Sequence, residues 1–244
     1  MAEELEKWIN THVREQKKNN EGEQYFKNFF REEFRPLFYD PNAFYSPADG
    51  VIIYQKTVKP DQKIIEVKGK NYTLKDIMMD KSDEFKTSKN YHVVGIFMTY
   101  YDVHVNRVPT DGLLKYNLLD SIESYNLPMI FMEKDILKKE LNYKESDNTY
   151  LFNNERMRND IIYMKKNIKY HVIQVADKDV NNITHFTVDN PEYFTQGERF
   201  SFIRWGSQCD LIIPEHPKYN FKFLQKPLMH VKAGIDKIVE IQEK

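Results

Sequence analysis

Apolar residues at the start of the chain repeat with the period of a helix. Within residues 1–14 they recur at spacings of three and four positions: Leu5, Trp8, Ile9 and Val13. A second run, residues 23–40, gathers aromatic side chains on one side before Pro36 ends it. We therefore predict that residues 1–40 form a helical segment packed on the rest of the protein. The alternative is that the aromatic run, together with residues 37–39, contacts a lipid surface.

From about residue 45 the pattern changes to short apolar runs typical of β-strands. They are bounded by Gly, Pro, Asn and Asp, and they comprise residues 51–55, 63–69, 92–100, 112–119, 160–166, 169–177, 199–205 and 210–214. Residues 72–78 have the pattern of a single short helix, and the spacing of the runs argues against regular βαβ units. Residues 177–190 are predicted to form a long loop or an edge hairpin, and residues 226–241 to form two strands joined by a turn at Ala233-Gly234. The chain is therefore predicted to be a β-dominated α+β protein with mixed sheets.

Composition and charge argue against several kinds of partner and structural feature. The 36 basic and 37 acidic residues nearly cancel and form no basic stripe, so we expect no nucleic-acid partner. A single cysteine allows no internal disulfide, and the seven histidines lack the spacing of a metal site. No apolar run approaches the roughly 18 residues of a membrane span, and the start of the chain lacks the pattern of a signal peptide. We expect a cytoplasmic protein, and contact with a membrane surface stays open.

The stretch FIRWGSQCDLIIP, residues 202–214, places a Gly-Ser step between two apolar runs. One interpretation is a tight turn of a hairpin. The other is that the bond between Gly206 and Ser207 is meant to break, because glycine leaves its carbonyl open to the neighbouring hydroxyl. Cys209 is the rival nucleophile, although a lone cysteine in a strand is more often a small buried apolar residue.

Two further stretches carry polar groups in unusual settings. In YYDVHVNRVPTDG, an extended backbone places Asp102, His104 and Asn106 on one face. Such a polar row with a central histidine is typical of acid–base chemistry, and a solvated edge strand is the equally open alternative. In SPADG, Asp49 occupies a bend before a strand, which is also the place of an ordinary turn residue.

In chain order, five motifs resemble those of the phosphatidylserine decarboxylase family of pyruvoyl-dependent enzymes. They are FYSPADGVI, KGKNYTLKDIM, IFMTYYDVHVNRVPTDG, LFNNERM and GERFSFIRWGSQCDLIIP, which together span roughly residues 45–214. The details resemble the short, compact subfamily. The longer enzymes carry His-x-x-His and Gly-Ser-Thr, where this chain has Arg107 in place of the second histidine and Gln208 in place of the threonine.

The resemblance implies that the chain cuts itself. Ser207 would attack the Gly206 carbonyl, with His104 as the base and Asp49 orienting His104, and Ser207 would become a covalent pyruvoyl group. That group is the cofactor that the resemblance implies, and it acts as an electron sink during loss of carbon dioxide. From side-chain chemistry, Asn106 and Arg107 are candidates to bind an anionic group of the substrate.

The resemblance also sets expectations for organisation and substrate. Residues 41–244 would form the catalytic domain after the helical segment 1–40, with a barrel-sandwich (lipoyl-like) half that includes residues 231–241. Cleavage would give pieces 1–206 and 207–244. The implied reaction converts phosphatidylserine to phosphatidylethanolamine. The alternatives are a decarboxylase of a soluble amino acid or related amine and a non-cleaving, non-enzymatic relative. Homodimers are common in the family.

Overall fold

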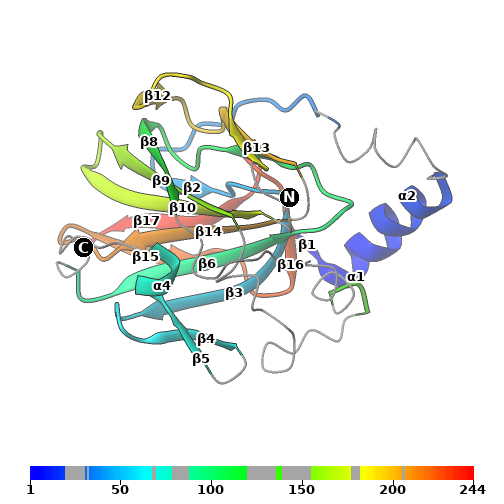
Figure 1. Cartoon of the computed structure of the whole chain (residues 1–244), viewed down its shortest axis with the longest axis horizontal. Helices are drawn as coiled ribbons and strands as arrows, with labels where there is room; N and C mark the ends of the chain where they lie inside the picture. Colours follow the sequence, from blue (N-terminus) through cyan, green and yellow to red (C-terminus); the bar gives the residue numbers. More distant parts are fainter. Residues whose placement is uncertain are drawn as a thin grey trace.

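A nine-stranded antiparallel sheet forms the centre of the protein (Figure 1). The structure is a computed structural model, and it describes residues 1–19, 31, 33–67, 70–78, 88–119, 136–138, 155–176, 182–204 and 207–244. Across the sheet the strands are β1 (Glu3–Glu4), β16 (Met229–Val231), β3 (Gly50–Val58), β6 (Tyr91–Met98), β14 (Ser207–Pro214), β10 (Ile168–Ala176), β9 (Arg156–Tyr163), β8 (Gly112–Leu119) and β12 (Glu192–Phe194).

Three smaller sheets complete the described fold. They are β11 (Ile183–His185), β13 (Arg199–Ile203) and β7 (Val105–Arg107); β15 (Tyr219–Phe223), β17 (Lys237–Glu243) and β2 (Ala43–Tyr45); and β4 (Lys63–Val67) with β5 (Lys70–Thr73). The short helix α4 (Leu74–Met78) follows β5. The β-dominated α+β class is confirmed. The described sheets are antiparallel and not mixed as expected, because every pairing between these strands is antiparallel.

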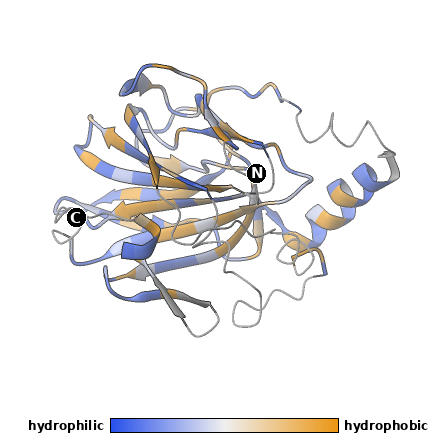
Figure 2. Cartoon of the chain, viewed as in Figure 1, coloured by the Kyte–Doolittle hydropathy of each residue, from blue (hydrophilic) through white to orange (hydrophobic). Residues whose placement is uncertain are grey.

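The strand β14 occupies the middle of the large sheet, with β6 on one side and β10 on the other. Its side chains are buried on both faces and point alternately to opposite sides of the sheet. Cys209 and Leu211 belong to one hydrophobic cluster and Ile212 belongs to the other. Figure 2 shows the hydrophobic character of these central strands. Ser207 begins the strand and shares the face of Cys209.

The chain begins with a short helical segment, as predicted from its periodicity. It consists of α1 (Leu5–Trp8), the π-helical turn η1 (Ile9–Val13) and α2 (Arg14–Asn19). The four periodic apolar residues are buried in the cluster that covers β3 and β6. Most of the second predicted helix lies outside the described residues, and its described end, residues 33–40, has no regular structure. None of the described helices is long and apolar enough to cross a membrane.

Two local expectations are corrected. The strands β13 and β14 lie in different sheets, so the Gly-Ser step does not join the two arms of a hairpin. The predicted strands within residues 226–241 are present as β16 and β17, and a turn with Gly234 at φ +68° lies between them, yet they too belong to different sheets. The sheet β15–β17–β2 is open, and the barrel-sandwich half stays a prediction, as does the domain boundary at residue 40.

Candidate active site

The segment after β6 is a tight turn and not a continuing strand. The Asp102 N–H donates to the Thr99 carbonyl oxygen at 3.1 Å, and Asp102 Oδ2 accepts from the N–H and Oγ1 of Thr99, both at 2.8 Å. Because β7 begins only at Val105, the polar residues of this stretch do not form the single face predicted from an extended backbone. The turn sends Asp102 and His104 to different neighbours.

Ser207 and His104 meet in the buried interior. The Ser207 hydroxyl oxygen Oγ lies 3.3 Å from His104 Nδ1, and both residues are fully buried. His104 Nε2 lies 2.9 Å from the carbonyl oxygen of Thr99, which can only accept, so Nε2 carries the ring proton. Burial lowers the pKa of His104 to about 4, and the ring is therefore neutral at pH 7. Nδ1 thus presents its electron pair to Ser207, which is the arrangement of a nucleophile and its base.

A thioether and an amide complete the surroundings of Ser207. Ser207 Oγ lies 3.0 Å from Met98 Sδ, so the hydroxyl proton has two acceptors within reach, this sulfur and His104 Nδ1. The Asn106 amide nitrogen Nδ2 lies 3.7 Å from Met98 Sδ and 3.6 Å from Cys209 Sγ. The candidate Asn106 therefore contacts the same sulfur atom as the Ser207 hydroxyl.

Cys209 is poorly suited to act as the nucleophile. Burial, helped by the nearby Asp210, raises the pKa of its thiol well above the ordinary value. A thiol that stays protonated is a weak nucleophile. Among the two candidates in this strand, the geometry and the electrostatics favour Ser207.

Asp49 has a different partner from the one predicted. Its Oδ1 and Oδ2 accept from Arg35 Nη1 and Nη2 at 2.5 and 2.6 Å, and Oδ1 also accepts from the Ala233 N–H at 2.7 Å. His104 is instead oriented by the hydrogen bond that its Nε2–H donates to the Thr99 carbonyl oxygen. Asp49 acts on His104 through its negative charge, which favours the protonated ring against the larger effect of burial.

The opposite face of β14 carries a second buried polar cluster. Asp210 Oδ1 accepts from the Tyr54 hydroxyl and from Gln208 Nε2, both at 2.8 Å, and Gln208 Nε2 also donates to the Tyr54 hydroxyl at 2.9 Å. Asp210 Oδ2 has no partner among the described residues. Burial raises the pKa of Asp210 to about 7, against these hydrogen bonds.

A pocket of about 540 Å³ lies beside β7. Its lining residues are Glu33, Phe34, Arg35, Leu37, Arg107, Glu198 and Arg199. Arg107 donates from Nη1 to the Gly197 carbonyl oxygen at 2.8 Å. Because neighbouring residues of a strand point to opposite faces, β7 directs Asn106 toward the sulfur atoms of Met98 and Cys209 and Arg107 into the pocket.

The residues around position 207 fit a small covalent carbonyl group such as the pyruvoyl group. The position is fully buried, and its described neighbours are neutral groups: the imidazole of His104, the thioether of Met98 and, across that sulfur, the amide of Asn106. Gly206, the other half of the predicted cleavage site, lies outside the described residues. No cluster of described side chains is arranged to hold a metal ion.

Sequence reasoning did not find three of the groups at the site. Met98 and Thr99 were counted within an ordinary strand, and Arg35 was counted within an aromatic helix. No local pattern marks them, because their roles depend on strand pairing. Ser207 and Met98 are direct partners in the register of β14 and β6, a relationship that spans more than a hundred residues of sequence.

Comparison with known proteins identifies the family of the chain. The sequence profile of the family described as phosphatidylserine decarboxylase matches residues 23–238. A phosphatidylserine decarboxylase proenzyme of Chlorobium limicola is 28% identical over 206 residues, which cover 84% of this chain and 74% of the relative. One of Geotalea uraniireducens is 26% identical over 188 residues, covering 77% of this chain and 68% of the relative. The chain belongs to the phosphatidylserine decarboxylase family.

Proposed function

We propose that this chain is a proenzyme that cuts itself between Gly206 and Ser207 and then converts phosphatidylserine to phosphatidylethanolamine with release of carbon dioxide. The observation that carries the proposal is the buried contact of 3.3 Å between Ser207 Oγ and His104 Nδ1, with the ring proton held on Nε2 by the Thr99 carbonyl. Membership of the family supplies the reaction.

The self-cleavage follows from these atoms. His104 Nδ1 takes the hydroxyl proton as Ser207 Oγ attacks the carbonyl carbon of Gly206, and the C–N bond breaks while the Ser207 nitrogen gains a proton. The resulting ester is opened by loss of the Cα proton of residue 207, which expels the Gly206 carboxylate and leaves a double bond between Cα and Cβ. Water then replaces the nitrogen, ammonia leaves, and the pyruvoyl group remains at the start of residues 207–244.

The described residues have definite tasks in the second reaction. A pyruvoyl group supplies a ketone that withdraws electrons from an amine substrate while carbon dioxide departs. His104 keeps one proton on Nε2 and can carry a second on Nδ1. Because burial disfavours the charged ring, His104 readily gives the second proton to the substrate carbon that has lost its carboxylate. Ser207, His104 and Met98 are all fully buried, and this burial keeps water from the step.

The pocket beside β7 is the proposed place of the lipid head group. Arg107 and Arg199 line it, and their guanidinium groups suit a phosphate or carboxylate. We expect Arg107→Ala to raise KM for phosphatidylserine by about tenfold or more, since a hydrogen bond to a charged group contributes about 1.5–3 kcal/mol. An unchanged KM would remove Arg107 from this role.

Exposed apolar side chains continue from the pocket rim and support contact with a membrane surface. Phe34, Leu37 and Tyr39 are 96%, 55% and 51% exposed. We expect the double variant Leu37→Glu with Phe38→Glu to lose sedimentation with phosphatidylserine vesicles while its self-cleavage is retained. The matched control is Leu118→Glu with Met164→Glu, which changes two exposed apolar residues elsewhere on the surface. Equal sedimentation of both variants would argue against this surface.

Intact mass spectrometry tests the central proposal. The wild-type chain of 29.4 kDa should give two pieces split at 206/207, the second carrying a pyruvoyl group, and Ser207→Ala should stay uncut. Cys209→Ala is the control and should be cut normally. Cleaved protein is then supplied with phosphatidylserine vesicles or free amino acids, and release of carbon dioxide identifies the substrate class. A wild-type chain that stays whole under all conditions would overturn the proposal in favour of a non-cleaving relative.

A further inference from the structure

The turn at residues 99–102, which orients His104, is stabilised by the carboxylate of Asp102. Asp102 Oδ2 accepts both hydrogen bonds from Thr99, and the Asp102 N–H closes the turn on the Thr99 carbonyl oxygen. That same oxygen receives the Nε2 proton of His104. The position of the Thr99 carbonyl, and therefore the tautomer of His104, depends on how Asp102 is held.

Asp102 is held by a residue from the far end of the chain. Its second carboxylate oxygen, Oδ1, lies 2.7 Å from His230 Nε2, and the two side chains are 2% and 3% exposed. Burial alone would raise the pKa of Asp102, but the charge and hydrogen bond of His230, followed by the Thr99 hydrogen bonds, lower it below the ordinary value. Asp102 is thus an ionised carboxylate, and both of its oxygen atoms take part in hydrogen bonds.

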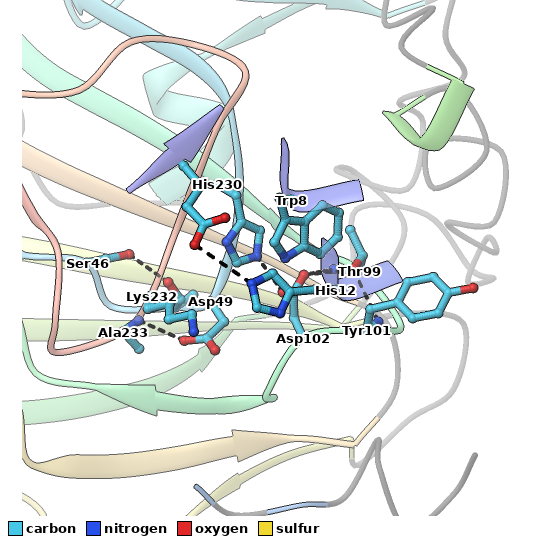
Figure 3. A network of polar contacts seen from close by, with 12 residues as sticks. Trp8, His12, Ser46, Asp49, Thr99, Tyr101, Asp102, His230, Lys232 and Ala233 are labelled. Atoms are coloured by element: carbon cyan, nitrogen blue, oxygen red, sulfur yellow. Dashed lines mark hydrogen bonds and ion pairs between the residues drawn. The ribbon is translucent and has the colours of Figure 1, made fainter. Parts of the chain in front are cut away.

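His230 is fixed by an aromatic stack and by strand pairing. The indole of Trp8 lies parallel to the imidazole, with ring centroids 4.3 Å apart and an interplanar angle of 13°. His230 also pairs with Val51 of β3 and with Glu3 of β1. Figure 3 shows the imidazole of His230 next to both Trp8 and Asp102, with Thr99 on the far side of the Asp102 carboxylate. Segments from both ends of the chain therefore meet at the turn that orients the base.

We infer that Asp102 and His230 form a positioning pair that fixes the tautomer of His104 through the Thr99 carbonyl, with Trp8 holding the His230 ring. Neither residue touches Ser207 in the described contacts, so both are positioning residues and not catalytic ones. The pair sits across the proposed cut, because Asp102 belongs to residues 1–206 and His230 to residues 207–244. It therefore stays available to orient His104 after cleavage. This inference rests on the proposed function only where it predicts a change in the rate of self-cleavage.

The first test reads the tautomer and does not require cleavage. Uncut Ser207→Ala protein with ¹⁵N-labelled histidine is compared with the same protein carrying His230→Phe, and the His104 signals are assigned with His104→Gln. Phenylalanine keeps the stack on Trp8 but removes the donor to Asp102. We expect a single Nε2–H tautomer in the parent and a mixture of both tautomers in the His230→Phe variant. Asp102→Asn is the second variant, and it should produce the same mixture.

The matched control is another histidine–aspartate pair, which is partly buried and has the same nitrogen–oxygen distance. His171 Nδ1 lies 2.7 Å from Asp160 Oδ1 on strands β10 and β9. In otherwise wild-type chains, His230→Phe should slow self-cleavage about 10- to 100-fold, the scale expected when a reacting group is misplaced. His171→Phe should leave the rate unchanged, and His230→Gln, which restores a donor, should recover part of it. Thermal unfolding of each variant shows whether a slow rate merely follows a loss of folded protein.

The outcomes separate the two claims. The positioning role would be overturned if folded His230→Phe had the same His104 tautomer ratio and the same cleavage rate as His171→Phe. A tautomer shift in a chain whose wild type never cuts itself would support the positioning role while the proposed function fails. A slower rate without any tautomer shift would also overturn the inference, because the pair would then act by another route.

Discussion

At the scale of single residues, the burial of His104 sets the pH range of self-cleavage. A base with a pKa of about 4 is almost fully in its unprotonated form from about one pH unit above that value. Acid inactivation should therefore occur near pH 4 and not near 6.5, where an exposed histidine titrates. We expect the cleavage rate of freshly translated chain to change little between pH 5.5 and 8. An acid limb with a midpoint near 6.5 would show that His104 is hydrated before it reacts.

Removal of the base tests the same residue directly. His104→Gln keeps a polar side chain of similar size but cannot accept and then release the Ser207 proton at Nδ1. General-base catalysis by a positioned side chain contributes about 10²- to 10⁴-fold, so the cleavage rate should fall at least about 100-fold. The rate is measured as the uncut fraction over time by mass spectrometry. A variant that is cut at the wild-type rate would remove His104 from the reaction.

The raised pKa of Asp210 predicts how the stability of the folded protein depends on pH. Its pKa in the folded protein is about 7, above the ordinary value of 3.8, so the folded state binds this proton more tightly than the unfolded state. The stabilisation is fully present below about pH 3.8 and is lost as the pH rises through about 7. In an uncut Ser207→Ala background, Asp210→Asn should therefore gain stability relative to its parent between pH 5.5 and pH 8. Urea midpoints measure the difference, with the exposed Asp61→Asn as the control. Parallel curves for parent and Asp210→Asn would contradict the buried, protonated carboxyl.

The residues of the site show where sequence reasoning reached and where it stopped. Ser207 and His104 were identified from motifs, and the structure brings them together. Asp49 was expected to orient His104, because the resemblance to the family implies that role. The structure gives that task to the backbone of Thr99, since the hydrogen bonds of Asp49 go to Arg35 and to the Ala233 N–H. A backbone carbonyl has no sequence signature, so its part was not predictable from residue types.

At the scale of strands, Tyr54 of β3 extends across Gly95 of β6 and contacts Asp210 of β14. A Cβ atom on Gly95 of β6 would lie 2.4 Å from the Tyr54 ring, so glycine is required where the ring crosses toward Asp210. Gly95→Ala should lower the free energy of unfolding by about 1–3 kcal/mol, the usual cost of overpacking. Urea unfolding of the uncut chain measures the loss.

A double-mutant cycle shows whether the loss comes from this crossing. With Tyr54→Ala in place, the ring that obstructs the new Cβ is absent, so Gly95→Ala should then cost much less. An equal loss in the presence and absence of the Tyr54 ring would mean that the glycine serves the backbone and not the aromatic side chain.

The positions of strands were predicted better than their partners. The run 112–119 coincides with β8, and the other central runs differ from the observed strands by a few residues, because apolar and β-branched residues mark strands locally. Pairing depends on residues far apart in the chain. The pattern therefore did not reveal that β13 and β14, close neighbours in sequence, belong to different sheets, or that β14 lies between β6 and β10.

At the scale of the whole molecule, the topology holds the two proposed pieces together. Residues 207–244 supply β14 between β6 and β10, β16 beside β3, and β17 beside β2. All of these partner strands come from residues 1–206. A cut between residues 206 and 207 breaks no strand pairing, because β13 and β14 already lie in different sheets. The cleaved protein should therefore elute from a native sizing column with the uncut Ser207→Ala protein and separate into two pieces only in denaturant.

The cut nevertheless changes how stability depends on concentration. Unfolding of the uncut chain releases one molecule, whereas unfolding of the cleaved protein releases two, so mass action favours the folded state of the cleaved form at higher concentration. We expect the urea midpoint of cleaved wild type to rise over a hundredfold increase in protein concentration, while the midpoint of Ser207→Ala stays constant. A concentration-independent midpoint for the cleaved form would mean that residues 1–206 stay folded after the second piece is lost. That result is inconsistent with a sheet whose central strand is β14, since its departure would leave the facing edges of β6 and β10 without partners.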